Sequence, residues 1–161
     1  MKAGKNPPSI SSHLCFNLYA TSLKMTNLYR PLLAELGLTY PQYLVMLVLW
    51  EQDGLGIGAI AEKLHQDSGS VTPLVKRLER LGYLSRERSS LDERALRIVL
   101  TQPGRELRGA AAKVTAQVTH ACNIGQADLD ELMSRIGVLA RTLAGGSDSA
   151  SIPQSGRCEV S

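Results

Sequence analysis

Two helical segments separated by a short polar turn, and followed by two strand-like segments, constrain the fold of this chain more than any other feature. In residues 57–64 and 68–81, apolar side chains recur at intervals of three and four, the spacing of a helix with one buried face. The period then changes, and residues 83–88 and 95–101 have the pattern of two short strands joined by a polar loop. We therefore expect two adjacent helices followed directly by a small β-hairpin.

The ends of the central helices carry clear signals. Thr39 and Gln42 form a T-x-x-Q capping box, which predicts the start of a buried helix that ends near Asp53. Asp67 or Ser68 is placed to cap the longer helix of the pair. The expected buried face of that helix comprises Val71, Leu74, Val75, Leu78 and Leu81. Together with the hairpin, these elements predict a winged helix-turn-helix, a mainly α fold with a small β-hairpin wing.

Longer helices are expected on both sides of the winged region. Residues 11–36 have helical spacing, with Ser11 or Ser12 as the cap and Pro31 as a late kink or the end of the regular part. Residues 103–144 contain two apolar seams spaced by three and four, as in coiled coils. The seams comprise Leu107, Ala111, Val114, Val118 and Ala121, then Leu129, Leu132, Ile136, Leu139 and Leu143. Three such helices present more apolar surface than a small winged domain can cover, which predicts a dimer.

Composition supports one compact globular domain. The chain has 161 residues, of which 43% are apolar and 20% charged. We expect a flexible N-terminus at residues 1–10, dimerisation helices at 11–36 and 103–144, a winged region at 37–102 and a disordered tail at 145–161.

The sequence also predicts the compartment. The longest apolar run, residues 44–50, is too short to cross a bilayer, and residues 2–8 lack the apolar core of a signal peptide. Three widely spaced cysteines are more typical of reduced thiols than of a disulfide framework. We therefore expect a cytoplasmic protein with no membrane contact.

The basic residues gather in one part of the chain. Residues 76–108 contain nine basic and five acidic side chains, a local surplus suited to binding phosphates. On the longer helix of the pair, the face opposite the apolar stripe is polar or basic and suits a DNA major groove. The predicted DNA-binding residues are Ser68, Ser70, Thr72, Pro73, Lys76 and Arg77 on this face, with Arg86, Asp92 and Arg94 in the hairpin. A solvated face without a ligand and a protein-interaction module are the alternatives.

Cys15 lies close in sequence to most of the aromatic residues of an aromatic-poor chain. Phe16, Tyr19, Tyr29, Tyr40 and Tyr43 all fall within 28 residues. Cys15 is expected in the first turn of its helix, where unpaired N–H groups favour a thiolate, the form that peroxides oxidise. Tyr19 follows four residues later on the same helical face and can donate a hydrogen bond to the sulfur. The alternative is an ordinary packed cysteine.

The sequence does not indicate other chemistry. His13 and Cys15, like His120 and Cys122, are two residues apart, so on a helix their side chains diverge by about 200° and do not favour a metal site. No glycine-rich phosphate loop, catalytic triad or carboxylate pair stands out. We therefore expect no metal, no cofactor and no catalytic site, in a protein that is not an enzyme.

Two sets of motifs resemble a known family. Residues 78–101, L-x-x-x-G-Y-L-x-R-E-R-S-x-x-D-E-R-A-L-R-I-V-L-T, resemble the MarR family of bacterial transcription regulators. Residues 14–22 (L-C-F-N-L-Y-A-T-S), Tyr29, L-T-Y-P-Q-Y and L-V-L-W resemble the organic hydroperoxide resistance regulators within that family, and the similarity extends over residues 12–143. The resemblance implies a homodimer with interlocking N- and C-terminal helices that binds a pseudo-palindromic operator in double-stranded DNA.

The same resemblance implies a redox role for two cysteines. Cys15 would be the sensor that organic hydroperoxides oxidise, with Tyr29 and Tyr40 holding its sulfur across the dimer. The predicted sensor pocket comprises Phe16, Tyr19, Tyr29 and Tyr40. In the two-cysteine branch, Cys122 of the other subunit acts as the resolving thiol, and the disulfide with Cys15 releases operator DNA. Cys122 as a plain core residue and Cys158 as the resolving thiol are the alternatives.

Two other functions stay open at this level. A repressor of the same family could be released by a small apolar acid bound between the dimer helices and the winged domain, with Cys15 merely packed there. A thiol peroxidase that uses Cys15 catalytically is the enzymatic alternative. Replacing Cys15 by serine separates them, because only a response to a non-covalent ligand should survive.

Overall fold

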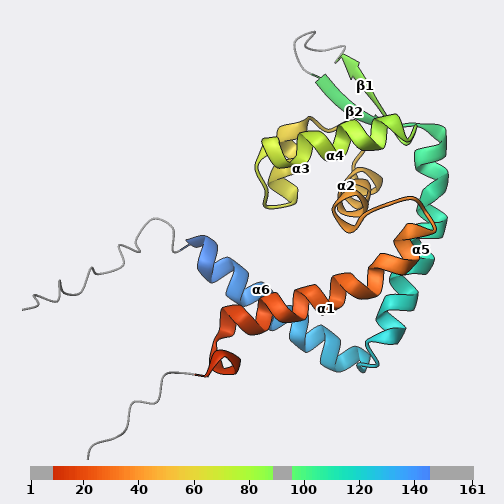
Figure 1. Ribbon diagram of the computed structural model, residues 1–161. Coiled ribbons are helices and arrows are strands. Elements are labelled where there is room, and N and C mark those ends of the chain that lie inside the picture. Colours follow the sequence, from red (N-terminus) through yellow and green to blue (C-terminus); the bar gives the residue numbers. More distant parts are fainter. Residues whose placement is uncertain (1–8, 89–95, 146–161) are drawn as a thin grey trace, which may run out of the picture. The chain divides into compact units, whose positions relative to one another are not determined.

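A computed structural model describes residues 9–88 and 96–145 and shows a mainly helical chain with one antiparallel hairpin (Figure 1). The described elements are the 3-10 helix η1 (Ile10–Ser12), α1 (Leu14–Ala34), α2 (Tyr40–Glu51), α3 (Ile57–Lys63), α4 (Ser68–Arg80), β1 (Leu84–Arg88), β2 (Leu96–Leu100), α5 (Gln102–Ala121) and α6 (Gln126–Gly145). The predicted mainly α fold with a hairpin wing is confirmed. The hairpin residues Asp92 and Arg94, the terminal residues 1–8 and the tail 146–161 with Cys158 lie outside the described residues.

Residue contacts divide the chain after Ala121 into two compact units, residues 1–121 and 122–161. The first unit contains α1 to α5 and the hairpin, and the described part of the second consists of α6 and the turn before it. Within the first unit, α1 packs against α2 and α5, and α2 packs against α4 (Figure 1). The winged region therefore shares one compact unit with the long helices α1 and α5.

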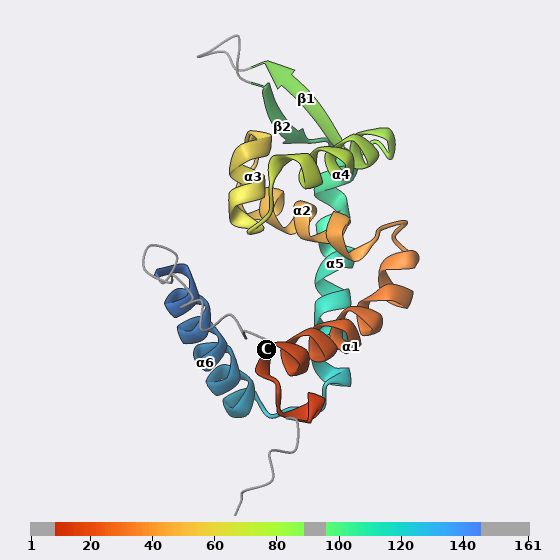
Figure 2. The same ribbon diagram turned by 60° about the vertical axis from the view of Figure 1, so that its left-hand side comes forward.

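The winged region is built from α2, α3, α4 and the hairpin. Helix α3 packs beside α4, and the hairpin projects from the end of α4 (Figure 2). Strands β1 and β2 are antiparallel, with Leu84 opposite Leu100, and Leu55 adds an isolated bridge to Ile98. Buried side chains from every one of these elements meet in a single core: Val45, Met46, Leu49, Ile60, Val71, Val75, Leu78, Leu84, Ile98 and Leu100.

Polar side chains fix the ends of α2 and α4. At the start of α2, the Gln42 side-chain oxygen accepts the backbone N–H of Thr39 at 2.8 Å, as the predicted capping box requires. At the start of α4, the Asp67 carboxylate accepts the backbone N–H of Ser70 at 2.9 Å. Gly82 ends the turn after α4 with φ +79°, a left-handed conformation that glycine adopts without strain. The predicted caps at the starts of α2 and α4 are confirmed, with Asp67 as the cap of α4.

The predicted serine cap of α1 is wrong. Ser11 and Ser12 belong to η1, where the Ser12 hydroxyl donates to the Ser9 carbonyl at 2.6 Å. His13 occupies the cap position of α1 and makes no side-chain capping hydrogen bond. The serine hydroxyls compete for a local turn, as serines often do, and the helix begins two residues after the last of them.

Two further local expectations differ from the structure. Of the two interpretations of Pro31, the end of the helix is wrong, because α1 continues through Pro31 to Ala34. Leu81, expected on the buried face of α4, is 46% exposed because the helix ends one residue earlier, at Arg80.

Burial is uneven along the long helices. Leu33 is the buried residue of α1, whereas α5 buries Ala111, Val114 and Val118. Helix α6 contains no buried residue. Within residues 9–88 and 96–145, no helix is both long enough and apolar enough to span a membrane.

Candidate nucleic-acid interface and redox site

Helix α4 presents the predicted DNA-contacting residues on its uncovered side. Ser68, Ser70, Pro73, Lys76 and Arg77 are exposed and Thr72 is half-buried, whereas Val71, Val75 and Leu78 on the other side are buried. The sequence places these two sets on opposite faces because their spacing follows the helical period. The structure therefore brings the six predicted α4 residues together on one face.

Two of these polar residues also stabilise the start of α4. The Ser70 hydroxyl donates to the Asp67 carboxylate at 2.7 Å, and the Thr72 hydroxyl donates to the Ser68 carbonyl at 2.6 Å. The hydrogen bonds from the Ser70 side chain and then from its backbone N–H lower the pKa of Asp67 below its usual value. The cap thus keeps an anion at the positive end of the helix.

Arg86 in the hairpin has an intramolecular partner. Its Nε lies 3.1 Å from Oε2 of Glu79 on α4, and the arginine side chain is 25% exposed. This ion pair joins β1 to the last turn of α4. The other predicted wing contacts, Asp92 and Arg94, lie outside the described residues.

Cys15 is exposed and is the second residue of α1. Phe16 and Tyr19 on the same helix are also exposed, at 38% and 64%. No described residue covers this segment closely enough to bury any side chain before Leu33. The predicted thiol is therefore accessible to a small molecule in the single chain.

Tyr29 and Tyr40 form a separate aromatic group. Their ring centroids lie 5.0 Å apart, and Tyr43 joins them at 5.8 Å from Tyr29 and 6.3 Å from Tyr40. Burial, and secondarily the nearby Tyr43, raise the pKa of Tyr40 above its usual value. Cys15 and Tyr29 are fourteen residues apart on one helix, a separation of about 21 Å along its axis. A single chain therefore does not bring the predicted sensor pocket together.

Cys122 directly follows the last residue of α5. It is half-buried and belongs to the second unit, in the turn that leads to α6. The structure thus places Cys15 and Cys122 in different units of the chain. In the described ranges 9–88 and 96–145, no group of three or more His, Cys, Asp or Glu residues is arranged to hold a metal ion.

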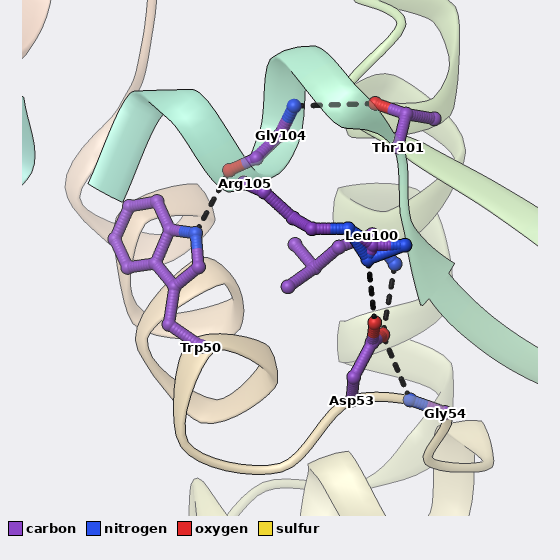
Figure 3. A network of polar contacts seen from close by, with 7 residues as sticks. All are labelled: Trp50, Asp53, Gly54, Leu100, Thr101, Gly104 and Arg105. Carbon is purple, nitrogen blue, oxygen red and sulfur yellow. Dashed lines mark hydrogen bonds and ion pairs between the residues drawn. The ribbon is translucent and has the colours of Figure 1, made fainter. Parts of the chain in front are cut away.

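The sequence analysis missed a polar network at the base of the hairpin. Asp53, Trp50 and Arg105 connect α2, β2 and α5 there, and Figure 3 shows these contacts. These residues lie 47 to 54 positions from their partners, so no local spacing rule could reveal the contacts. The network lies where the first turn of α5 meets the end of β2.

Comparison with known proteins identifies the class of this chain. The model of the family described as transcriptional regulator SarA/Rot matches residues 27–110. The chain is 41% identical over 134 residues to the organic hydroperoxide resistance transcriptional regulator of Bacillus subtilis. The aligned residues make up 83% of this chain and 91% of that relative.

Two solved structures have a similar fold. Reduced AbfR bound to DNA matches with a TM-score of 0.72 at 33% identity, over 84% of this chain and 93% of that chain. Disulfide-formed AbfR matches with a TM-score of 0.60 at 34% identity, over 84% and 90% of the two chains.

The paired helices, the hairpin and the exposed face of α4 define a winged-helix transcriptional regulator. With the similarities above, they show that the chain belongs to the MarR family, in the group of the organic hydroperoxide resistance regulators, as the sequence motifs predicted. Its matched relatives are transcription regulators rather than enzymes.

Proposed function

We propose that the chain forms a homodimeric repressor that binds operator DNA while Cys15 is reduced and releases it when an organic hydroperoxide oxidises Cys15. The observation that carries this proposal is the place of Cys15, an exposed thiol in the first turn of α1 in a regulator of this family. A peroxide can reach the sulfur because the side chain is exposed.

Uncovered apolar surface supports the homodimer. Large apolar side chains of α1 and α6 are exposed in the single chain: Leu14, Phe16, Leu18, Tyr19, Leu23, Met25 and Leu28, and Leu132, Met133, Ile136, Val138 and Leu143. Exposed apolar side chains on this scale are typical of an interface, and a second copy would cover them symmetrically.

The second subunit also completes the sensor site in this proposal. Tyr29, whose ring contacts that of Tyr40, lies about 21 Å along α1 from Cys15 of the same chain. A partner subunit whose α1 crosses this helix can bring its own tyrosine pair to the sulfur. Beside Tyr40 lies a groove of about 520 Å³, lined also by Thr26, Arg30 and Pro41, which is wide enough for the organic part of a hydroperoxide.

The chemistry takes two balanced steps. The Cys15 thiolate attacks the hydroperoxide, the O–O bond breaks, the sulfur becomes a sulfenic acid, and the peroxide leaves as an alcohol after taking up a proton. The Cys122 thiolate of the partner subunit then attacks that sulfur, an S–S bond forms, and hydroxide leaves to become water.

Disulfide geometry converts this chemistry into movement. The two Cα atoms must approach to about 4.4–6.8 Å. Cys122 directly follows the C-terminal end of α5, and α5 packs against strand β2 of the hairpin. A displacement of the C-terminal end of α5 by the disulfide would therefore change the position of the winged region. Release of DNA follows from that displacement.

The exposed face of α4 is the proposed DNA contact, with the hairpin as the second contact. Lys76 and Arg77 would meet phosphates, and Ser68 and Pro73 would lie toward the base edges. Each phosphate that is neutralised contributes roughly 0.9 to the log–log slope of affinity against salt, so binding should weaken steeply with ionic strength.

The test uses an operator selected from a random DNA pool by the reduced protein. Fluorescence anisotropy then follows release as tert-butyl hydroperoxide is added to the wild type, Cys15→Ser, Cys122→Ser and the control Cys158→Ser. We expect release from the wild type and the control, and continued binding by Cys15→Ser. Continued binding by a wild type whose Cys15 is demonstrably oxidised would overturn the proposal.

One cavity favours a second candidate function, release by a small apolar acid. A groove of about 260 Å³ between α2 and α5 is lined by apolar and aromatic residues with one cation and one carboxylate among them: Tyr43, Leu47, Trp50, Glu51, Arg108, Ala111, Ala112 and Thr115. The same variants decide between the two, because a non-covalent ligand would still release Cys15→Ser from DNA.

A further inference from the structure

One carboxylate joins three elements where the winged region meets α5 (Figure 3). Asp53, two residues beyond α2, accepts the backbone N–H of Leu100 at 2.8 Å and that of Gly54 at 2.9 Å on Oδ1. Its Oδ2 lies 3.1 Å from Nη1 of Arg105, in the first turn of α5. The end of β2 and the start of α5 are therefore held by the same side chain.

Neighbouring contacts fix the start of α5 further. The Trp50 indole N–H donates to the Gly104 carbonyl at 2.8 Å in a buried hydrogen bond, and the Gly104 N–H donates to the Thr101 hydroxyl at 3.2 Å. The Thr101 hydroxyl in turn donates to the Gly82 carbonyl at 2.6 Å. A Cβ added at Gly104 would collide with the Tyr83 carbonyl oxygen. The first turn of α5 thus sits directly on the base of the hairpin.

We propose that Asp53 is a positioning residue that holds β2 to the end of α2, which Trp50 in turn holds to α5, so that the wing follows this helix when the far end of the helix moves. The inference rests on the proposed function. Helix α5 has 20 residues and spans about 30 Å, with Cys122 directly after its last residue. A disulfide at one end of the helix can reorient the wing only if the other end is attached to it.

The contacts of Asp53 differ in strength. The ion pair with Arg105 is exposed, at 36% for Asp53 and 50% for Arg105, so water screens it and its contribution is small. The hydrogen bond from Leu100 is partly buried and ends on a charged acceptor, which makes it the stronger tie. Asparagine at position 53 keeps an oxygen that can accept this N–H, whereas alanine leaves it without an acceptor.

The variants separate the hydrogen bond from Leu100 to Asp53 from the weaker ion pair between Asp53 and Arg105. The variants are Asp53→Ala, Asp53→Asn and Arg105→Gln. The matched control is Arg135→Gln, which removes an exposed arginine–carboxylate contact of 2.6 Å on α6 and changes the net charge as Arg105→Gln does. The rate of amide hydrogen exchange at Leu100 measures the hydrogen bond from Leu100 to Asp53 directly. Ile98 is the internal reference, because the N–H of Ile98 donates to the Leu55 carbonyl and not to Asp53.

We expect Leu100 to exchange at least about tenfold faster in Asp53→Ala than in the wild type, with Ile98 changed little. The affinity of the reduced, folded variant for the selected operator should fall by about tenfold or more. Asp53→Asn and Arg105→Gln should lie within about threefold of the control Arg135→Gln. Circular dichroism and size-exclusion chromatography verify that each variant is folded and has the assembly state of the wild type.

A purely structural role would lower the melting temperature and leave the operator affinity of the folded variant unchanged, which would overturn the proposal. Unaltered Leu100 exchange in Asp53→Ala would overturn it as well. A wild type that binds no DNA would instead defeat the proposed function, while faster Leu100 exchange in Asp53→Ala would still support the link between β2 and the end of α2.

Discussion

The winged region and the first half of helix α1 are packed in opposite ways within one chain. In the winged region, Val71, Leu78 and Ile98 are completely buried. In the first half of α1, Leu14, Leu18 and Leu23 are 58%, 40% and 47% exposed. The two segments have similar kinds of apolar side chains, but among the described residues only the first segment has partners that bury them.

This difference separates a well-packed region from a helical segment whose apolar side chains are left exposed. The winged region packs around a buried core that also includes Leu33 of α1 and Ala111 and Val114 of α5, and this core holds α4 in place. The segment that carries Cys15 has few contacts, so its position depends on whatever covers it. In the account proposed above, a second subunit provides that cover, and oxidation changes it.

The largest effect should come from a pair of leucines, one in each region. Leu78→Ala should lower the free energy of unfolding by about 2–5 kcal/mol, because it leaves a cavity in the core. Leu18→Ala should leave the winged core unchanged and weaken dimerisation instead. Denaturant unfolding and sedimentation at several protein concentrations measure the two effects. Equal losses of unfolding free energy, with no effect of Leu18→Ala on assembly, would remove the contrast between the regions.

Two glycines of α5 should respond to alanine with opposite signs. Gly104→Ala should destabilise the protein by about 1–3 kcal/mol, because the new Cβ would strike the Tyr83 carbonyl. Gly109→Ala meets nothing within 4 Å and should stabilise the helix by about 0.5–1 kcal/mol. Thermal unfolding of both variants decides this. A neutral Gly104→Ala would mean that the base of the hairpin is not tightly packed against α5.

Two tyrosines test the same contrast at a smaller scale. The hydroxyls of Tyr43 and Thr115 share a hydrogen bond of 2.7 Å between α2 and α5, so Tyr43→Phe should cost about 0.5–1.5 kcal/mol. Tyr19 is 64% exposed, and Tyr19→Phe should not change the unfolding free energy. Denaturant titrations compare the two. An equal cost for both would contradict the assignment of Tyr43 to the packed region.

The smallest expected effect is a shift in the pKa of Tyr40. Burial, and then Tyr43, raise the pKa of Tyr40 above 10.0, so the folded state favours the neutral phenol. The resulting stabilisation is complete below the unfolded pKa and is lost as pH rises through the folded one. Absorbance of tyrosinate in the wild type, minus that in Tyr40→Phe, should give a midpoint above 10.0. A midpoint at or below that value would contradict the packing of Tyr40 described above.

Local signals made much of the fold predictable. Thr39, Gln42 and Asp67 act within three residues, and the periods of three and two define helices and strands directly. The same locality explains the errors. The hydroxyl of Ser12 could cap α1 or close its own turn, and only the structure shows the second choice. Leu81 follows the helical period of α4 but lies just beyond its end.

The candidate site was predictable only in part. The exposed face of α4 follows from helical spacing, and Cys15 from its place at the start of α1. The network around Asp53 joins residues about 50 positions apart, and pairing at that distance leaves no periodic trace. The grouping of Tyr29 with Tyr40 came from resemblance rather than spacing, because α1 and α2 must first fold together.

The central claim is that oxidation links Cys15 of one subunit to Cys122 of the other and that this link releases DNA. Mixed dimers of a Cys15→Ser chain and an isotope-labelled Cys122→Ser chain, treated with tert-butyl hydroperoxide, test it by non-reducing peptide mass spectrometry alongside operator binding. The account predicts a peptide pair that joins Cys15 of the labelled chain to Cys122 of the unlabelled one and that appears as DNA is lost. Complete release of DNA with Cys15 still reduced would contradict the account.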